Sequence, residues 1–267
     1  MTGPVAPAVP STILAVHNRY KQHGGEDVVF DAETALLEAH GHRVERFVVD
    51  NEQIDERPGF GEALGLAART VWSVRAARVL RNRVRRLRPD LVHVHNFFPL
   101  LSPSIYSACR SEGAAVVQTL HNYRLVCPVA TLYRDGHPCE DCLGRAFAWP
   151  GIIHACYRES ASASAAVATM LAFHRARRTW SRDVDLYVAV SAFLRSKLVE
   201  GLLEPDRVVV KPNFVRGTAE PGSNPDGPFL YVGRLSPDKG IETLLEAWAH
   251  VPSHVNLRIV GDGPLGP

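Results

Sequence analysis

Short apolar runs alternate with longer amphipathic stretches along most of the chain. Strand-length apolar runs lie at residues 12–18, 43–50, 90–96, 114–122, 185–191 and 207–213. Between the first two runs, residues 25–42 have the period of a helix, and Gly41 is a typical helix stop. The apolar positions of this stretch recur at three- and four-residue steps: Val28, Val29, Ala32, Leu36 and Ala39. Strands separated by helices predict an α/β domain with a mostly parallel sheet covered on both faces.

The last part of the chain begins a second unit. Residues 215–227 are rich in Pro, Gly, Asn and Ser and predict a linker between two domains. A strand, a helix and another strand follow within 228–267. We therefore expect a disordered lead-in at 1–10, a complete α/β domain at 11–214 and the first βαβ unit of a second domain. One such unit buries too little surface to fold alone, so we expect the chain to be incomplete.

The composition indicates a globular protein but does not indicate its function. The 267 residues are 46% hydrophobic and 22% charged, with a net charge of +2, which is ordinary for a globular protein. The first apolar stretch, 13–16, is too short for a signal peptide or a membrane span. We expect a cytoplasmic protein whose five cysteines are reduced.

Polar motifs follow several predicted strands, at the sheet edge where open parallel sheets bind ligands. Gly24 and Gly25 precede a helix, so backbone amides and the positive helix end can approach an anion. A glycine-rich turn without a ligand is the alternative, and the glycine pair taken alone favours it. In the later motif "GRLSPDKG", Arg234 and Lys239 can converge on one point, as a pyrophosphate requires. A solvated pair of charges is the plainer alternative.

Histidines end two other predicted strands. His121 follows a buried strand directly, beside Asn122, and is either a ligand contact or a satisfied rim residue. His93 and His95 share one strand face, because side chains alternate, and His-x-His can bind metal. The sequence shows no third ligand with a matching signal. A metal hydrolase built on this pair is therefore the minor interpretation.

These motifs resemble those of a known family. "HGGEDVV", "HVHNFFPLLSP", "TLHNYRLVCP", "VKPNFV" and the series "YVGRLSPDKGIETLLEAWA" then "LRIVGDGP" look like retaining GT-B glycosyltransferases of family 4. The resemblance covers nearly all of residues 12–264. It implies two Rossmann-like domains, a nucleotide-diphosphate sugar donor and a saccharide or lipid-linked acceptor.

The resemblance also implies roles for individual residues. Arg234 and Lys239 match the pair that grips the donor diphosphate, and His121 matches the histidine near the transferred sugar. The donor-binding set it implies is Gly24, Gly25, Gly233, Arg234, Lys239 and Gly261. His95, Asn96 and Asn122 would lie on the acceptor side of the cleft. Transfer would retain configuration and need no metal, because basic side chains stabilise the leaving phosphate.

One departure from the family pattern bears on activity. The family carries two glutamates separated by seven residues in its second domain, and this spacing occurs nowhere in the chain. We therefore expect a hexosyltransferase of polysaccharide, glycolipid or cell-envelope synthesis that is weakly active or inactive as this chain. The alternative is a non-catalytic fragment that binds an acceptor or a partner protein.

The stretch 123–157 is rich in cysteine. Cys139 and Cys142 form one Cys-x2-Cys pair, flanked by Cys127 and Cys156. In a reducing compartment four such thiolates could bind a structural zinc ion that pins a long loop. Strong zinc ribbons have two such pairs, so reduced free thiols are the open alternative. Cys109, in a predicted helix, is expected in the core.

Residues 69–88 carry eight arginines and no acid, and the expected structure is one helix. Its apolar side would gather Trp72, Ala76, Val79, Leu80, Val84 and Leu87, with most arginines opposite. The basic face is either solvated or in contact with anionic lipid headgroups or a phosphate-bearing acceptor. No aromatic stacking pattern accompanies the charge, so nucleic acid is not an expected partner.

Overall fold

A computed structural model describes residues 11–21, 24–54, 59–215 and 227–266 of the chain. They fall into two compact units, Met1–Arg216 and Gly217–Pro267, which are considered separately. The predicted lead-in at 1–10 and nearly all of the predicted linker lie outside the described residues.

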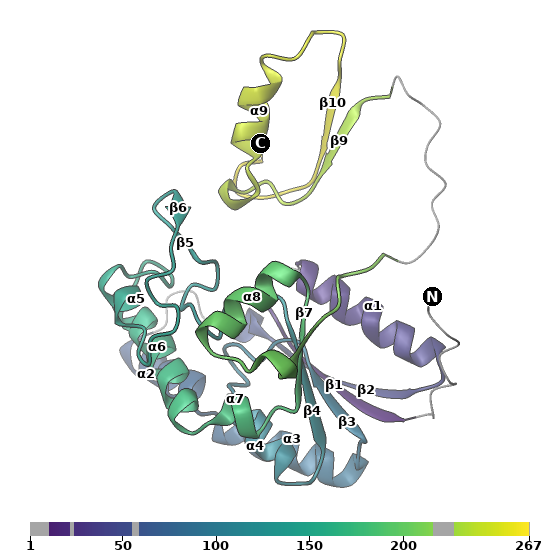
Figure 1. Ribbon diagram of the computed structural model, residues 1–267, viewed down its shortest axis with the longest axis vertical. Helices are drawn as coiled ribbons and strands as arrows, with labels where there is room; N and C mark the ends of the chain where they lie inside the picture. Colours follow the sequence, from purple (N-terminus) through teal and green to yellow (C-terminus); the bar gives the residue numbers. More distant parts are fainter. Residues whose placement is uncertain (1–10, 22–23, 55–58, 216–226, 267) are drawn as a thin grey trace. The chain divides into compact units, whose positions relative to one another are not determined.

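The first unit is built on a six-stranded parallel sheet of order β2-β1-β3-β4-β7-β8 (Figure 1). Its strands are β1 (Thr12–Arg19), β2 (Arg43–Asp50), β3 (Leu91–Val94), β4 (Ala115–Leu120), β7 (Leu186–Ala189) and β8 (Val208–Val210). Each strand coincides with one of the predicted apolar runs. The order changes direction between β1 and β3, and ligands of such sheets bind at the carboxyl end of this switch point.

Helices connect the strands on both faces, with α1 on one face and α3 and α4 on the other (Figure 1). They are α1 (Gly25–Ala39), η1 (Asn51–Gln53), α2 (Phe60–Val71), α3 (Val74–Leu87), α4 (Ser104–Arg110), α5 (Trp149–Ile153), α6 (Ala161–Ala176), α7 (Thr179–Arg182), α8 (Ala192–Gly201) and η2 (Pro205–Arg207). The predicted stop of α1 is seen at Gly41, whose φ of 84° suits glycine. Cys109 is fully buried in α4, as expected.

The two faces of the sheet differ in chemistry. One contiguous apolar core joins the strands to α3, α4 and α8, with members such as Leu14, Val92, Leu80, Tyr106 and Leu198. Because side chains alternate along a strand, the neighbours of these residues point the other way, toward α1. There the carboxyl ends of β1 and β3 present the histidines His17, His93 and His95, after the aliphatic Ile13 and Ala15. The core stabilises the fold from one side, and the α1 side is free to carry polar groups.

The prediction of one helix over residues 69–88 is wrong. The chain leaves helical geometry at Trp72, with φ −148° and ψ 108°, and restarts at Ser73. The Ser73 hydroxyl caps α3 by accepting a hydrogen bond from the Ala76 amide at 3.3 Å. Its own amide donates to the Ser102 hydroxyl at 2.9 Å. Two buried hydrogen bonds therefore hold the break in place.

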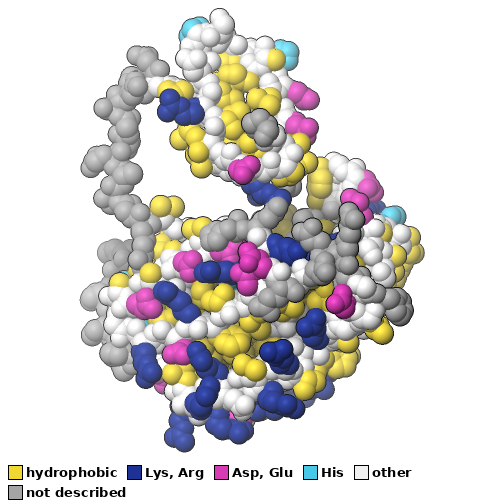
Figure 2. Space-filling view, turned by 180° about the vertical axis from the view of Figure 1, so that it is seen from behind, with side chains coloured by type: hydrophobic (Ala, Val, Ile, Leu, Met, Phe, Trp, Pro, Cys, Tyr) yellow, Lys and Arg dark blue, Asp and Glu magenta, His cyan; other side chains and the backbone are white. Residues whose placement is uncertain are grey.

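The basic face of α3 is partly neutralised. Arg83 pairs with Glu45 at 2.5 Å, and Arg85 pairs with Glu112 at 2.8 Å. Val79, which was expected on the packed side, is 43% exposed. Figure 2, seen from behind, shows Lys and Arg side chains gathered over the lower part of the first unit, where α3 and α4 lie.

The second unit is a single βαβ unit. It consists of the parallel strands β9 (Phe229–Val232) and β10 (Leu257–Val260), with η3 (Pro237–Lys239) and α9 (Ile241–Trp248) between them. Lys239 does not open α9. It ends the 3-10 turn η3, because Gly240, with φ 67°, interrupts the helical path before α9.

Two glycine-containing loops of this unit touch. A Cβ added at Gly261 would lie 1.8 Å from the carbonyl oxygen of Gly233, so the backbones approach too closely for any side chain. The amide of Leu235 donates to the carbonyl of Asp262 at 2.9 Å. The motifs "VGRLSPDKG" and "IVGDGP" thus form one joined loop pair.

Among the described residues, the helices are all too short or too polar to span a membrane.

Candidate functional site

The glycine loop forms the N-terminus of α1, directly after β1. Gly24 caps the helix, and its amide donates to the Asp27 carboxylate at 2.8 Å. Asp27 is buried, and its other oxygen lies 2.9 Å from Nε2 of His17 on β1. A Cβ added at Gly25 would meet no atom of the described residues within 4 Å, so these residues leave the space there open. An exposed, fixed helix N-terminus beside open space suits an anion.

Asparagines lock the ends of β1 and β3 at the switch point. Asn96 donates from Nδ2 to the carbonyl of Asn18 at 2.7 Å and accepts from the amide of Phe98 at 2.9 Å. The Asn18 side chain donates to Asn51 at 2.8 Å and accepts from the amide of Leu100 at 3.0 Å. Asn96 was expected to face an acceptor, but the structure engages both ends of its amide with the protein.

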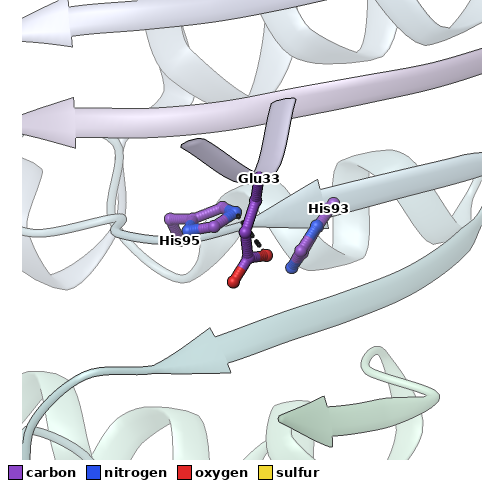
Figure 3. A group of neighbouring side chains, drawn as sticks. All are labelled: Glu33, His93 and His95. Atoms are coloured by element: carbon purple, nitrogen blue, oxygen red, sulfur yellow. Dashed lines mark ion pairs between the residues drawn. The ribbon is translucent and has the colours of Figure 1, made fainter. Parts of the chain in front are cut away.

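A cluster of buried polar side chains lies between α1 and the sheet (Figure 3). Glu33 of α1 lies beside His93 and His95, and their ligand atoms all lie within 4.8 Å of one another. Nε2 of His95 is 3.7 Å from Glu33, and Nε2 of His93 is 2.8 Å from the Thr119 hydroxyl. His121, at the end of β4, extends the cluster with its Nε2 3.4 Å from Nδ1 of His95. The structure thus brings His95 and His121 together.

Glu33 is the third ligand that the sequence did not reveal, but its carboxylate already contacts another charged group of the protein. The Lys211 ammonium lies 2.5 Å from the Glu33 carboxylate, and it follows β8 directly. A divalent cation would have to displace this lysine and compete with Thr119 for Nε2 of His93. The arrangement is that of an ion pair with neutral histidines around it, which disfavours a metal hydrolase.

Burial keeps these histidines uncharged. Burial lowers the pKa of His93 and of His121 to about 4, and nearby cations such as Lys211 add to the effect. Burial also lowers the pKa of His17, despite the hydrogen bond to Asp27, and lowers that of His95 well below its usual range. At neutral pH, His121 can therefore offer a lone pair or a single N–H to a ligand.

Acidification is expected to destabilise the first unit. Histidines with a usual pKa of 6.5 take up protons in the unfolded chain as pH falls from 6.5 toward 4, whereas His93 and His121 stay neutral in the fold. The free energy of unfolding should fall by about 1.4 kcal/mol per pH unit for each such proton. Burial raises the pKa of Glu26 to about 7, which opposes this trend between pH 7 and 4.5. More histidines than carboxyls shift, so the net change is a loss.

Urea unfolding at pH 7.5 and 5.5 measures this loss. His93→Gln should make the pH dependence shallower, whereas His137→Gln, on an exposed strand, should leave it unchanged. Equal stability at the two pH values would contradict the prediction.

A second polar group surrounds the N-terminus of α1. Asn122 donates from Nδ2 to Glu26 at 2.8 Å and accepts from the amide of Arg124 at 3.0 Å. The Arg124 guanidinium lies 4.2 Å from the centre of the Phe98 ring and 5.2 Å from that of Tyr157. The expected cleft residue Asn122 therefore links the glycine loop to the loop after β4.

An apolar cavity of about 500 Å³ adjoins these rings. It lies between α2 and α6, where Leu64, Ala67, Ala163 and Val167 line it, and Phe98 and Tyr157 contribute to its wall. Phe98 comes two residues after Asn96, so the cavity begins at the loop that follows β3. Its volume and its apolar lining suit an apolar ligand.

The predicted cations of the second unit lie on its loops. Arg234 follows β9 and is exposed, and Lys239 ends η3 and is exposed too. Gly233 and Gly261 lie in the joined loop pair and bring the carboxyl ends of β9 and β10 together. These four residues share the edge of one βαβ unit, where ligands of parallel sheets bind.

The four cysteines of the insert are free thiols, of which Cys127 is buried and Cys139, Cys142 and Cys156 are partly buried.

Sequence reasoning missed three residues of the first unit. Glu26 stood within the quoted "HGGEDVV" motif, and its place after the glycines was an available signal. Lys211 stood in "VKPNFV", which was noted only for its resemblance. Glu33 is one of several acids on its helix, and nothing in the sequence marks it.

Comparison with known proteins identifies the family. The model of Glycosyltransferase Family 4 matches residues 23–216, which is most of the chain. The chain belongs to Glycosyltransferase Family 4. No curated protein matches it significantly in sequence. The resemblance noted in the motifs is confirmed.

Solved glycosyltransferase structures share the fold of this Family 4 chain. The lipopolysaccharide outer core galactosyltransferase WaaB, in its apo form, is 14% identical with a TM-score of 0.50, over 95% of this chain and 61% of that chain. The catalytic domain of starch synthase IV from Arabidopsis thaliana, bound to ADP and acarbose, is 11% identical with a TM-score of 0.52, over 96% and 69%. The chain thus spans about three fifths of the length of the WaaB structure. The expected α/β fold of the GT-B type is confirmed.

Proposed function

We propose that this Family 4 protein moves a hexose from a nucleotide-diphosphate sugar to a hydroxyl acceptor with retention of configuration. One observation carries the proposal. The open glycine loop and the neutral His121 lie at the same carboxyl edge of a Family 4 sheet, linked through Asn122 and Glu26. The starch synthase domain, of similar fold, binds ADP.

Different residues would have different roles in such a transfer. The N-terminus of α1 at Gly25 suits a donor phosphate, and Arg234 and Lys239 would stabilise the negative charge of the departing diphosphate. Neutral His121 can hold a sugar hydroxyl without repelling the positive charge that develops on the sugar ring. The departing phosphate would accept the proton of the acceptor hydroxyl. The chemistry needs no metal in this proposal, because the basic side chains provide the stabilisation.

The acceptor we propose is lipid-linked. The 500 Å³ cavity is lined mainly by small and apolar side chains, which fits an alkyl or prenyl chain better than a sugar. The exposed arginines of α3, such as Arg75, Arg78 and Arg86, would contact anionic headgroups at a cytoplasmic membrane surface. The reaction would then belong to glycolipid, polysaccharide or cell-envelope synthesis.

Turnover tests the proposal directly. The protein encoded by the complete reading frame is mixed with UDP-, ADP- or GDP-linked hexoses and a polyprenyl phosphate or saccharide acceptor. Release of nucleoside diphosphate is measured, and the anomeric configuration of the product is read by NMR. We expect transfer with retention that His121→Ala reduces by about 10²-fold, whereas His137→Ala, on the exposed hairpin, does not.

Other outcomes separate the alternatives. The 267-residue chain is assayed in parallel, because it spans 61% of the length of the WaaB structure. Binding of an acceptor without turnover by the complete protein would overturn the enzyme proposal in favour of a binding module. Inversion of configuration would overturn the proposed mechanism alone.

A further inference from the structure

The proposed glycosyl-transfer site uses the insert 123–157 only at its ends, through Arg124 and Tyr157, although the whole segment is elaborately folded. It contains a hairpin of two-residue strands, β5 (Tyr133–Arg134) and β6 (His137–Pro138), and the short helix α5. Several of its large apolar side chains are exposed, among them Tyr133 at 54% and Trp149 at 47%. Loops of this length that lack extended regular structure need another source of stability.

Packing brings two of the four cysteines to the same place on α8. The side chains of Val126 and Leu143 both lie against Gly201 at the end of α8. Val126 precedes Cys127, and Leu143 follows Cys142. A Cβ added at Gly201 would lie 2.8 Å from Val126 and 2.7 Å from Leu143. Because each of these contacts is one residue from a cysteine, Cys127 and Cys142 are held near each other.

Gly151 joins the remaining parts of the cluster. A Cβ on Gly151 would lie 2.8 Å from the ring of Pro128, the residue after Cys127. The Gly151 carbonyl accepts the amide of Cys156 at 3.0 Å, and the Gly151 amide donates to the carbonyl of Ala148 at 3.2 Å. Cys156 and the residue after Cys127 therefore meet at a single glycine.

Cys139 directly follows the hairpin of β5 and β6. Its amide donates to the carbonyl of Leu132 at 2.8 Å, which holds it beside the strand pair. The carbonyl of Glu140 accepts the amide of Leu143 at 2.9 Å, so Cys139 directly precedes a tight turn that contains Cys142. A Cys-x2-Cys turn of this kind presents two sulfurs to one ion.

We propose that Cys127, Cys139, Cys142 and Cys156 bind one structural zinc ion that fastens the insert to α8 and to the end of β4. Zinc prefers four tetrahedral thiolates with Zn–S bonds of about 2.3 Å. Within the described part of the chain, the cysteine sulfurs do not form a group within 4.8 Å as Glu33, His93 and His95 do. Binding therefore draws the sulfurs together and releases their protons.

Metal analysis with matched variants tests the proposal. The full chain is expressed with added zinc, purified under reducing conditions, and analysed by mass spectrometry for metal and by X-ray absorption for its ligands. We expect one zinc per chain with four sulfur ligands. Cys142→Ser should lose the ion, whereas Cys109→Ser, in the core of α4, should keep it.

His95→Gln controls for the other candidate group and should keep the zinc. Loss of zinc in His95→Gln with retention in Cys142→Ser would place the ion at Glu33 and overturn the proposal. Wild-type protein without zinc after expression with the metal would overturn it too.

A measurement on wild-type protein covers the case in which Cys142→Ser does not fold. The protein is alkylated with iodoacetamide before and after treatment with a strong chelator, and the modified cysteines are mapped by peptide mass. Zinc should protect the four insert cysteines, and chelation should make them reactive while Cys109 stays unmodified. Equal reactivity with and without the chelator would contradict zinc ligation.

Discussion

Arg234→Ala is expected to lower kcat/KM for sugar transfer by about 10²–10³-fold. Arg234 follows β9 in the loop that packs on Gly261, so its backbone position is fixed while its side chain is exposed. In the proposed mechanism, the guanidinium binds the diphosphate most strongly when negative charge builds up on the leaving group. Removing it should therefore raise the barrier to transfer more than it weakens donor binding.

Two further variants make this prediction specific. Arg258→Ala removes the same charge from an exposed position on β10 of the same unit, and we expect activity near that of the wild type. Arg234→Lys keeps the charge but loses the planar fork, so an intermediate rate is expected. Initial rates of nucleoside diphosphate release provide the measurement. An equal loss in Arg258→Ala and Arg234→Ala would show a general electrostatic effect in place of a contact with the donor.

Asn96→Ala is expected to reduce the free energy of unfolding by about 2–4 kcal/mol. The substitution leaves the carbonyl of Asn18 and the amide of Phe98 without their partners at 2.7 and 2.9 Å. Asn96 is 6% exposed, so water cannot easily replace the lost hydrogen bonds. Urea denaturation monitored by circular dichroism measures the change.

Asn122→Ala is the matched control. It removes the hydrogen bonds to Glu26 and from the Arg124 amide, but at a partly exposed position where water can replace them, and a loss of about 1 kcal/mol is expected. Should Asn96→Ala abolish transfer with unchanged stability, Asn96 would be an acceptor contact, as the sequence pattern suggested, and its role in joining β1 and β3 would be secondary.

Local patterns were sufficient to predict the strands and the glycine loop. The strands of the parallel sheet are short apolar runs, and β1 ends in a motif whose glycines begin α1. The break between α2 and α3 was not predictable in this way. It depends on Ser73 meeting Ser102, which lies 29 residues further along the chain.

The contacts inside the candidate site were even harder to predict from the sequence. Glu33 and Lys211 are 178 residues apart in the sequence. They meet only because the fold brings the residue after β8 against α1. The lowered pKa values of His93 and His121 depend on burial, which a pattern of alternating residues does not measure. The motif identified the edge of the sheet, and tertiary packing decided the chemistry there.

The ion pair between Lys211 and Glu33 has a consequence for the design of chimaeric glycosyltransferases. The chain that leaves β8 is fastened to the helix that carries the glycine loop before it continues toward the second unit. A hybrid protein that receives a different second domain should therefore be joined after Phe214, so that Lys211 stays with its own α1. A junction placed before Lys211 would remove the partner of a buried carboxylate and weaken the first domain, whatever donor the new domain binds.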